Sequence, residues 1–325
     1  MQPQVSFVIP CYNYGRFLRD CLQGIAAQDA GVEHEVIAVN DGSTDNTAAL
    51  LREAAAADRR IRVVDRAVNL GHVATVNEGL ALARGRYVVR VDPDDRHHSN
   101  FLRVTLPLLE SRPQLALVHG NFNLINEQGE VTARAAQAWG GKGRDCGNEF
   151  LALLKCNHIC APTVVARREA WMSAWPVPEG LAFNDWWFNL QLASRWDFGY
   201  VDEVVADYRV HANNHHTRIS RDGSEERSVL ALLGMIFSRR EDRPELQGAK
   251  MSAQDSVYAA QYLDFARKYF GHGMHGEARR CFLQAWRHHP RSLLDARILR
   301  WWMASFLTPP QWRRLKALLG RRIEA

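Results

Sequence analysis

The sequence lacks several features that would assign it to a simple class of protein. No apolar run approaches the roughly 18–20 residues needed to cross a bilayer, so an integral membrane protein is not expected. The opening residues, MQPQVSFVIPCYN, hold no basic segment before a long apolar stretch, so no signal peptide is expected. The six cysteines form no CxxC pair, which argues against a zinc site and predicts reduced thiols in a cytoplasmic protein.

Charge of one sign is not in excess over the whole chain, but it is unevenly distributed. The 41 Lys and Arg residues exceed the 36 Asp and Glu residues only slightly. Residues 221–325 hold 19 of the basic and 11 of the acidic residues, so the first 220 residues are mildly acidic. The 46% hydrophobic and 10% aromatic content excludes a disordered chain. We therefore expect a folded acidic body and a basic C-terminal region that faces an anionic partner.

Short β-branched runs alternate with helical periods in the first hundred residues. The predicted strands are 5–10, 35–40, 61–65 and 87–91, and the predicted helices between them are 14–27, 47–57 and 73–83. This alternation predicts an α/β fold with a mostly parallel sheet. Further helices are expected at 100–111, 149–154, 167–171 and 183–195, a hairpin at 116–133 and a late strand at 200–208.

The pattern becomes entirely helical after residue 220. We therefore expect two domains, at 1–220 and 221–325. Within the second, residues 258–290 resemble one helix pair of the tetratricopeptide type. A single copy cannot form a solenoid, so a packed helix pair is expected.

Polar clusters follow three of the predicted strands, at 11–13, 40–45 and 92–95. Ligands of α/β sheets bind beyond the carboxyl ends of the strands, so the three clusters are expected to line one crevice. Asp92 and Asp94 can face the same way because side chains alternate along a strand. Two carboxylates there favour a divalent cation that bridges phosphate oxygens. A capped turn is the alternative, because Asp and Pro are ordinary turn residues.

An ordered series of motifs resembles the inverting glycosyltransferases of family 2. The matching segments are VIPCYN at 8–13, Gln28, VNDGSTDNT at 39–47, NLG at 69–71, NEG at 77–79, ARG at 83–85, VDPDD at 91–95, NDW at 184–186 and YRVH at 208–211. The resemblance covers residues 4–215. It implies the GT-A (Rossmann-like) fold of nucleotide-diphospho-sugar transferases, a mixed, mostly parallel sheet flanked by helices, with an all-helical C-terminal appendage here.

The resemblance also implies a metal-dependent, inverting sugar transferase. Asp185 is the implied general base, which would deprotonate a hydroxyl of a glycan or a lipid-linked saccharide. Asp92, Asp94 and His211 are the implied ligands of Mn²⁺ or Mg²⁺, which would neutralise the leaving nucleoside diphosphate. The residues implied to bind the nucleotide of the donor, commonly uridine in this family, are Pro10, Tyr12, Asn13, Asp41, Asn69, Gly71, Asn77, Asp92 and Pro93.

Three positions depart from the family pattern. Asn184 stands where the family often has an acid, so Asp185 is expected to act without that neighbour. Val76 replaces a frequent basic residue, which weakens a phosphate contact from this helix. Asn40 replaces a common Asp, but Asp41 keeps the position that matters for the nucleotide.

Several of these residues have a structural alternative. Asp185 could be a plain helix N-cap. His211 could be a solvated loop histidine. Trp186 is expected to stack on the acceptor sugar, although a core position is the alternative. His97 and His98 are expected at the surface.

Two other functions remain open. A sugar-phosphate nucleotidyltransferase has a related fold, but the segment IPCYNYGRF at 9–17 lacks the glycine- and arginine-rich loop of those enzymes. A non-catalytic helical-repeat adaptor with a degenerate transferase domain is the second alternative. The intact aspartates at 41, 92, 94 and 185 argue against degeneration.

The C-terminal segments 299–306 and 310–322 combine Trp, Leu and Arg at helical spacing. That composition favours a helix on an anionic membrane surface, and a solvated basic face of a packed helix is the alternative. Nucleic acid is not an expected partner, because the body is acidic and no nucleic-acid-binding module is present. We therefore expect a cytoplasmic protein, peripheral on the inner face of the cell membrane.

Overall fold

The computed structural model describes residues 3–28, 31–136, 146–212, 223–241, 243–291, 295–307 and residue 311. The chain divides into two compact units, Met1–Asn214 and His215–Ala325. The predicted domain boundary at 220 lies outside the described residues, as does the predicted membrane segment 310–322 apart from Gln311. The first unit carries the sheet, and the second is helical where it is described.

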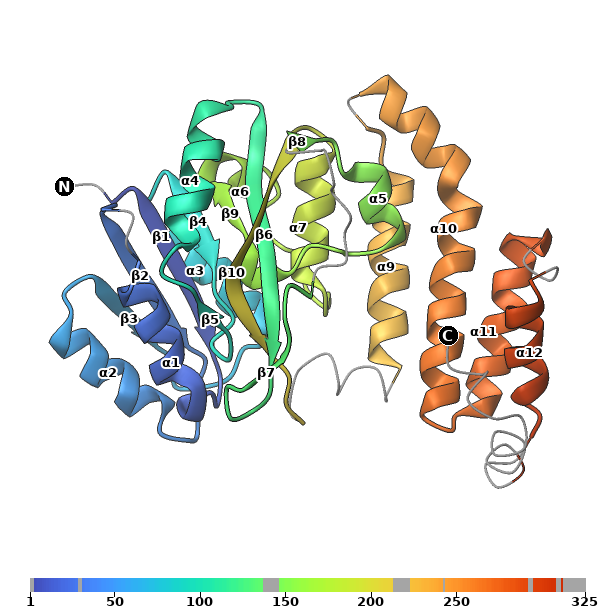
Figure 1. The fold of residues 1–325 in the computed structure, drawn as a ribbon, viewed down its shortest axis with the longest axis horizontal. Coiled ribbons are helices and arrows are strands. Elements are labelled where there is room, and N and C mark those ends of the chain that lie inside the picture. Colours follow the sequence, from blue (N-terminus) through green and yellow to red (C-terminus); the bar gives the residue numbers. More distant parts are fainter. Residues whose placement is uncertain are drawn as a thin grey trace. The chain divides into compact units, whose positions relative to one another are not determined.

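The first unit is built on one ten-stranded sheet. The strands are β1 (Val5–Cys11), β2 (His34–Asn40), β3 (Ile61–Asp65), β4 (Tyr87–Arg90), β5 (Arg96–His97), β6 (Leu115–Ile125), β7 (Val131–Ala133), β8 (Cys146–Gly147), β9 (Val165–Arg167) and β10 (Asp197–Arg209). Their order is β3-β2-β1-β4-β9-β6-β10-β5, with β7 beside β6 and β8 beside β10 (Figure 1).

The sheet has a parallel part and a mixed part. β1 to β4 run parallel to their neighbours among themselves, and β10 runs parallel to β6. β9 runs antiparallel between β4 and β6, and β5 runs antiparallel to β10. The predicted α/β fold with a mixed, mostly parallel sheet is confirmed.

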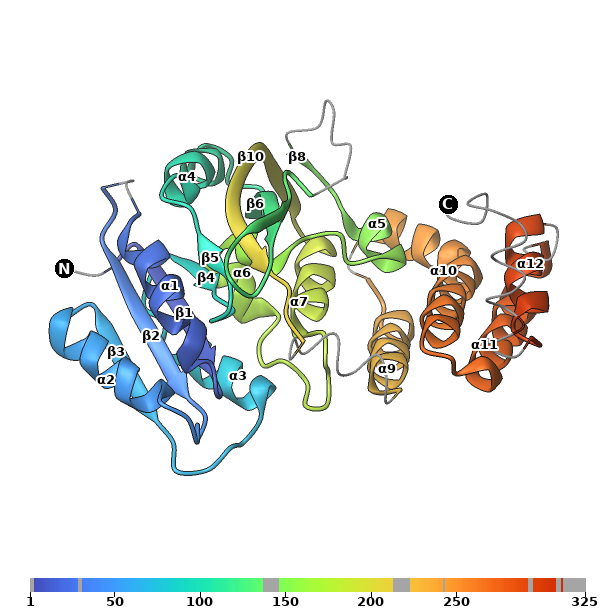
Figure 2. The same cartoon turned by 60° about the horizontal axis from the view of Figure 1, so that its bottom comes forward.

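Helices cover both faces of this sheet (Figure 2). They are α1 (Gly15–Ala26), α2 (Thr47–Ala57), α3 (His72–Leu82), α4 (Phe101–Ser111), α5 (Phe150–Lys155), η1 (Ala161–Thr163), α6 (Arg168–Ser173) and α7 (Asn184–Ala193). Alternation along β1 assigns α1 and α3 to opposite faces. Phe7 packs in one core cluster with Cys21 of α1, whereas a Cβ on Gly79 of α3 would lie 2.4 Å from Val8 Cγ1.

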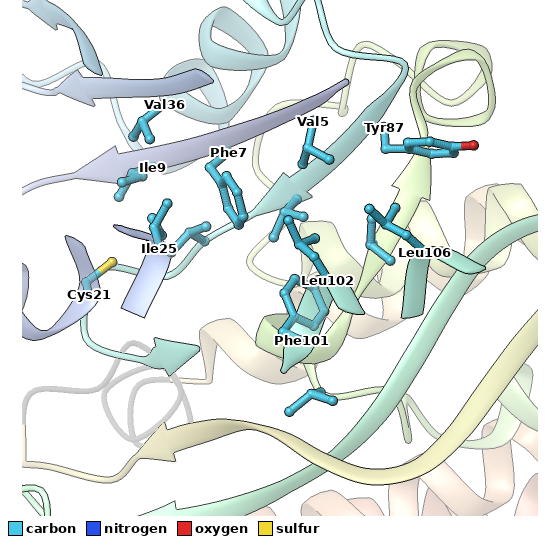
Figure 3. Packing of buried hydrophobic residues seen from close by; sticks show 14 of the residues in the cluster. Val5, Phe7, Ile9, Cys21, Ile25, Val36, Tyr87, Phe101, Leu102 and Leu106 are labelled. Atoms are coloured by element: carbon cyan, nitrogen blue, oxygen red, sulfur yellow. The ribbon is translucent and has the colours of Figure 1, made fainter. Parts of the chain in front are cut away.

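The apolar run of β1 forms the centre of the main core. Val5, Phe7 and Ile9 are fully buried and pack with apolar side chains of α1 and α4 (Figure 3). Ile25 of α1 and Phe101 of α4 belong to the same cluster. Burial of each such side chain contributes about 1.5–3 kcal/mol, which explains why this continuous β-branched run becomes a central strand.

The second unit contains α9 (Ser224–Ser238), α10 (Pro244–Gly271), α11 (His275–His288) and α12 (Ala296–Ala304). α10 and α11 form the predicted helix pair, although α10 begins at Pro244 and not near 258. The buried carboxylate of Glu226 connects three of these helices: Tyr269 Oη and Arg280 Nη2 donate to Glu226 Oε2 at 2.9 and 2.5 Å. Across the described ranges, every helix is too short or too polar to traverse a bilayer.

The described part of segment 299–306 is a packed helix with an exposed apolar edge. The Trp302 ring lies 5.0 Å from Trp286 of α11, and the Trp301 ring lies 5.3 Å from Phe270 of α10. Met303 and Phe306 are 53% and 58% exposed. The tryptophans of this segment therefore stabilise the helical unit, and the exposed edge is formed by other apolar residues.

Candidate active site

Three carboxylates follow β4 in a tight turn. The backbone N–H of Asp95 donates to Asp92 O at 3.0 Å, and Arg209 fixes the turn from the end of β10. Arg209 Nε donates to Asp94 O at 2.7 Å, and its backbone N–H donates to Asp95 Oδ1 at 2.8 Å. The guanidinium is 1% exposed and also donates to Glu127 O at 3.1 Å. The carboxylates are therefore held in a preformed arrangement.

The pKa values of two of these carboxylates are raised. Burial, together with repulsion from Asp94 and Asp185, raises the pKa of Asp92 to about 6, even though Arg90 opposes the shift. Burial and repulsion from Asp94 and Asp92 raise the pKa of Asp95 well above its ordinary value. Asp95 Oδ2 is buried and has no hydrogen-bond partner among the described residues. The cluster thus carries more negative charge than its surroundings neutralise.

His211 lies against this cluster, as the late motif predicts. Its Nε2 is 3.1 Å from Asp94 Oδ2, and its Nδ1 is 3.3 Å from Arg16 Nη2. The imidazole packs 4.9 Å from the ring of Phe17 and is buried, so a solvated loop histidine is not what forms. The carboxylate of Asp92 forms an ion pair with Arg90, whose Nη2 donates to Asp92 Oδ2 at 2.8 Å. Within the described ranges, no three His, Cys, Asp or Glu side chains converge in a metal-binding arrangement.

The loop after β1 is tied to the loop after β2. Asn13 has a φ of 60°, and its Oδ1 accepts hydrogen bonds from the backbone N–H groups of Thr44 and Asp45 at 2.8 and 3.3 Å. Its own N–H donates to Ser43 Oγ at 3.0 Å. Asn13 therefore fixes the loop geometry, while the neighbouring Tyr12 is 43% exposed and available to a ligand. Pro10 is buried within β1.

Asp41 follows β2, and its buried side chain is hydrogen-bonded to the loop after β3. Its Oδ1 accepts from Leu70 N and Arg66 Nη1, both at 2.9 Å, and its Oδ2 accepts from Gly71 N at 2.9 Å. Burial opposes ionisation, but the hydrogen bonds from Leu70, Arg66 and Gly71 lower the pKa of Asp41. All three donors belong to the protein, so the Asp41 carboxylate holds the loop after β3 in place.

Glycine is required where the loops after β2 and β3 meet. Gly42 has a φ of 67°, and a Cβ there would lie 2.7 Å from the carbonyl carbon of Val68. Gly71, with a φ of 94°, starts α3 and is followed by His72. Asn69 is exposed, and its Oδ1 accepts from Gly71 N at 2.9 Å. The predicted segment 69–71 is thus an exposed loop beside the candidate site.

The side chains of Asn77 and Val76 on α3 are both engaged within the protein. Asn77 Nδ2 donates to Val177 O at 3.1 Å, and Asn77 Oδ1 accepts from Val177 N at 2.9 Å. In this structure both polar atoms of the Asn77 amide are hydrogen-bonded to the backbone of Val177, and the nucleotide contact stays a prediction. Val76 is fully buried, so a basic residue would not fit that position without rearrangement.

Asp185 lies in the first turn of α7, beside the carboxylate turn. It is near enough to Asp92 and Arg90 to influence the charge of both groups. Its Oδ2 accepts from Asn157 Nδ2 at 2.8 Å. Phe183 occupies the N-cap position of α7, so Asp185 is not a plain N-cap. Asp185 therefore lies within electrostatic range of Asp92 and Arg90.

Two predicted positions are wrong. Trp186 is 5% exposed, and its Nε1 donates to Leu153 O at 2.7 Å, so it belongs to the core and not to an acceptor site. The cause is that α7 is buried on most of its sides. His97 is 2% exposed within β5, so it is not at the surface.

Pro93 is buried in the carboxylate turn.

Sequence reasoning gave no role to Arg90, Arg66 or Asn157, and it quoted Arg209 only as part of the motif YRVH. Arg90 is 6% exposed on β4, and a charged residue within the run YVVRV is a signal that could have found it. Arg66 and Arg209 make their contacts through distant loops, and Asn157 has no local signal.

A separate cavity of about 210 Å³ is lined by Arg86, Arg167, Arg168 and Glu169. Arg86 precedes β4, whereas Asp92 follows it, so the cavity lies at the other end of that strand. It is not part of the carboxylate cluster.

Comparison with known families decides the affiliation of the chain. Residues 6–171, just over half of the sequence, match the profile described as glycosyl transferase family 2. The chain belongs to glycosyl transferase family 2. The GT-A fold and the ordered motifs are those expected of this family.

Curated relatives of this family 2 chain are distant and mostly longer. An uncharacterised glycosyltransferase of Haemophilus influenzae is 29% identical over 39% of this chain and 39% of its own length. An uncharacterised protein of Mycobacterium tuberculosis is 29% identical over 64% of this chain and 59% of its own length. The chondroitin synthase of Pasteurella multocida is 29% identical over 73% of this chain, but only 24% of the synthase is covered. The chain thus spans less than two thirds of these relatives.

Solved structures support the fold. S. aureus TarS 1–349 in complex with UDP-GlcNAc superposes with a TM-score of 0.67 at 17% identity, covering 96% of this chain and 92% of TarS 1–349. The mannosyltransferase PcManGT from Pyrobaculum calidifontis, in complex with GDP-Man and Mn²⁺, gives a TM-score of 0.60 at 16% identity. That match covers 98% of this chain and 84% of the other.

Proposed function

We propose that the chain is a metal-dependent, inverting glycosyltransferase that moves a sugar from a nucleotide-diphospho-sugar, a UDP-sugar, to a hydroxyl of a glycan or a lipid-linked saccharide. The observation that carries the proposal is that Asp185 lies within electrostatic range of Asp92 in the carboxylate turn 92–95. Asp185 could accept the proton of an acceptor hydroxyl, and the carboxylate turn 92–95 could hold a cation that binds the charged leaving group. The relatives TarS and PcManGT, with UDP-GlcNAc and GDP-Man in their structures, support a nucleotide-sugar donor.

The residues of the turn fit a divalent cation. Carboxylate oxygens are the ligands that Mg²⁺ and Mn²⁺ prefer, and Asp95 Oδ2 is buried without a partner among the described residues. Asp92, Asp94 and His211 would hold the ion. Mg²⁺ is commonly bound by one or two carboxylates together with substrate phosphates, so a full set of protein ligands is not required. The bound ion neutralises charge on the leaving nucleoside diphosphate.

The chain's own residues carry the transfer in one step. Asp185 accepts the proton of the acceptor hydroxyl, and the hydroxyl oxygen forms a bond to the anomeric carbon. The bond from that carbon to the diphosphate oxygen breaks, and its electron pair leaves with the nucleoside diphosphate. In-line attack from the opposite side inverts the anomeric carbon. General base catalysis of this kind contributes about 10²–10⁴-fold in rate.

The nucleotide is expected to lie over the loops after β1 and β2. Tyr12 supplies an exposed ring for the base, and the loop 69–71 and Pro10 border the same edge. Asp41 and Asn13 support these loops through the hydrogen bonds described above. Family 2 membership argues against the nucleotidyltransferase alternative, and the organised carboxylates argue against a degenerate adaptor.

The C-terminal region is proposed to dock the enzyme on an anionic membrane where a lipid-linked acceptor resides. From residue 267 onward the chain holds 13 Lys and Arg residues against three acidic ones. Met303 and Phe306 add exposed apolar side chains to that region. Basic and apolar groups together favour binding to anionic lipid surfaces. The proposed location of the enzyme is therefore the cytoplasm, at the inner face of the membrane.

A thermal-shift screen tests the function directly. The full chain is mixed with UDP-Glc, UDP-GlcNAc, UDP-Gal or GDP-Man in the presence of Mn²⁺ or EDTA. A donor at about 100 times its dissociation constant stabilises the protein by about 2.7 kcal/mol, and we expect a UDP-sugar to do so only with Mn²⁺. Asp94→Asn should remove the metal-dependent shift, whereas Asp202→Asn, an exposed carboxylate on β10, should not. Equal shifts in EDTA would contradict the metal role, and no shift with any donor would contradict the function.

A further inference from the structure

Asn157 contacts the proposed base from a segment far away in the sequence. It follows the short helix α5, and its Nδ2 donates to Asp185 Oδ2 at 2.8 Å. Its Oδ1 accepts from Asn189 Nδ2 at 3.1 Å. Asn189 lies one helical turn after Asp185 on the same face of α7 and is 5% exposed. The three side chains form a closed relay that begins and ends on α7.

The chemistry of the relay fixes its direction. An ionised carboxylate only accepts hydrogen bonds, so Asn157 must present its NH₂ group to Asp185. Its carbonyl oxygen then faces Asn189, which must donate. The neutral amide of Asn157 donates a hydrogen bond to Asp185 Oδ2, but it neither transfers a proton to Asp185 nor adds a charge beside it. Asp185 Oδ1 is therefore the oxygen that remains for an acceptor hydroxyl.

We propose that Asn157 is a positioning residue for Asp185, an inference that rests on the proposed function. Asn157 holds Oδ2, and Asn189 holds Asn157, so the Asp185 carboxylate cannot rotate when the acceptor binds. During transfer Oδ1 takes the hydroxyl proton, while the amide keeps its hydrogen bond to Oδ2. Asn184, the neighbour that replaces the family's frequent acid, is 2% exposed within α7. The support for the base thus comes from the 157 segment and not from its neighbour in sequence.

The test separates positioning from folding. Asn157→Asp keeps the shape and the acceptor for Asn189 but replaces the donor to Asp185 by a second carboxylate that repels it, and Asn157→Ala removes both contacts without adding a charge. The readout is release of nucleoside diphosphate from the donor chosen by the thermal-shift screen, with water and a panel of monosaccharides as acceptors. We expect kcat to fall about 10–100-fold in both variants with the donor KM unchanged, because a misoriented catalytic group costs rate and not donor binding.

A matched control uses another amide that supports α7. Asn148 Nδ2 donates to Ala193 O at 2.7 Å and to Trp196 O at 3.2 Å, near the other end of the helix. Asn148→Ala should lower the unfolding temperature without lowering kcat. Asn157 variants that keep the wild-type kcat would overturn the proposal. It would also be overturned if they lost kcat only in parallel with stability, as a merely structural amide would.

Double variants distinguish this inference from the function on which it rests. In an Asp185→Asn background the base is already absent, so adding Asn157→Ala should lower kcat no further. Full activity of Asp185→Asn would sink the assignment of the base itself. An inactive Asp185→Asn beside fully active Asn157 variants would reject only the positioning role.

Discussion

Replacement of Asp41 by Asn separates a structural role from direct nucleotide binding. The change preserves the side-chain volume but removes the charge and one of two acceptor oxygens. In the wild type, Leu70 N and Gly71 N donate to different oxygens at 2.9 Å, and Arg66 donates to the first. An asparagine can accept from only one side, so its NH₂ group would face another N–H donor.

The expected cost follows from these contacts. A buried backbone N–H without its acceptor costs about 1–3 kcal/mol, and the lost partner of Arg66 adds to this. Arg66 keeps its pairing with Glu78, which limits the second contribution. We therefore expect Asp41→Asn to lower the free energy of unfolding by about 3 kcal/mol. For a unit of this size, that corresponds to a fall of about 6–12 °C in unfolding temperature.

The assay is thermal unfolding of the full chain, without ligand and with the nucleotide of the chosen donor. Asp65→Asn is the matched control, because Asp65 is exposed and accepts a single side-chain hydrogen bond from Asn40, at 2.7 Å. Its unfolding temperature should stay near the wild-type value. If Asp41→Asn kept the wild-type stability but lost nucleotide affinity, Asp41 would be a ligand-binding residue and the reasoning from its protein partners would be refuted.

Three further perturbations test other parts of the structure. Burial opposes ionisation of Asp207, but hydrogen bonds from His98, Asn123 and Arg96 lower its pKa, so its contribution to stability is present above the unfolded-state pKa of about 3.9 and is lost as pH falls. Asp207→Asn should therefore flatten the fall of unfolding temperature with acidification; an unchanged slope would contradict this. Lys250 is fully buried against Glu241, so Lys250→Met should lower the free energy of unfolding, measured in urea, by about 3 kcal/mol. Truncation after residue 290 should reduce sedimentation with phosphatidylserine vesicles, and equal sedimentation would retire the membrane role.

Local sequence patterns predicted the elements that depend on local chemistry. The helix at 47–57 and the strand at 61–65 have the predicted bounds, and α4 begins one residue after its predicted start. β5, β8 and β9 were not predicted, because these strands of two or three residues form only by pairing with strands distant in the sequence. β9 pairs with both β4 and β6, so a three-residue segment joins the parallel strands β1 to β4 to the rest of the sheet.

The same distinction holds within the site. The carboxylates 92–95 were predictable, because the end of a buried strand fixes where such residues lie. The direction of a side chain was not, and Trp186 shows this: its helix is buried on most sides, so the ring enters the core. Asn77 and Asn157 are occupied by partners in other segments, at Val177 and Asp185. Neither contact leaves a trace in local periodicity.

The carboxylates of the first unit fall into two groups that the sequence does not distinguish. Asp41 and Asp207 are surrounded by donors of the protein, which lower the pKa of each. Asp95 is buried and Asp92 is partly exposed in a turn where the acids repel one another, and the pKa of each is raised. A buried acid with enough donors stabilises the fold by itself, whereas one without them is most stable when a cation arrives. We therefore propose that the balance of donors around each acid, and not the motif alone, separates the residues that build the loops from those that would bind a metal ion.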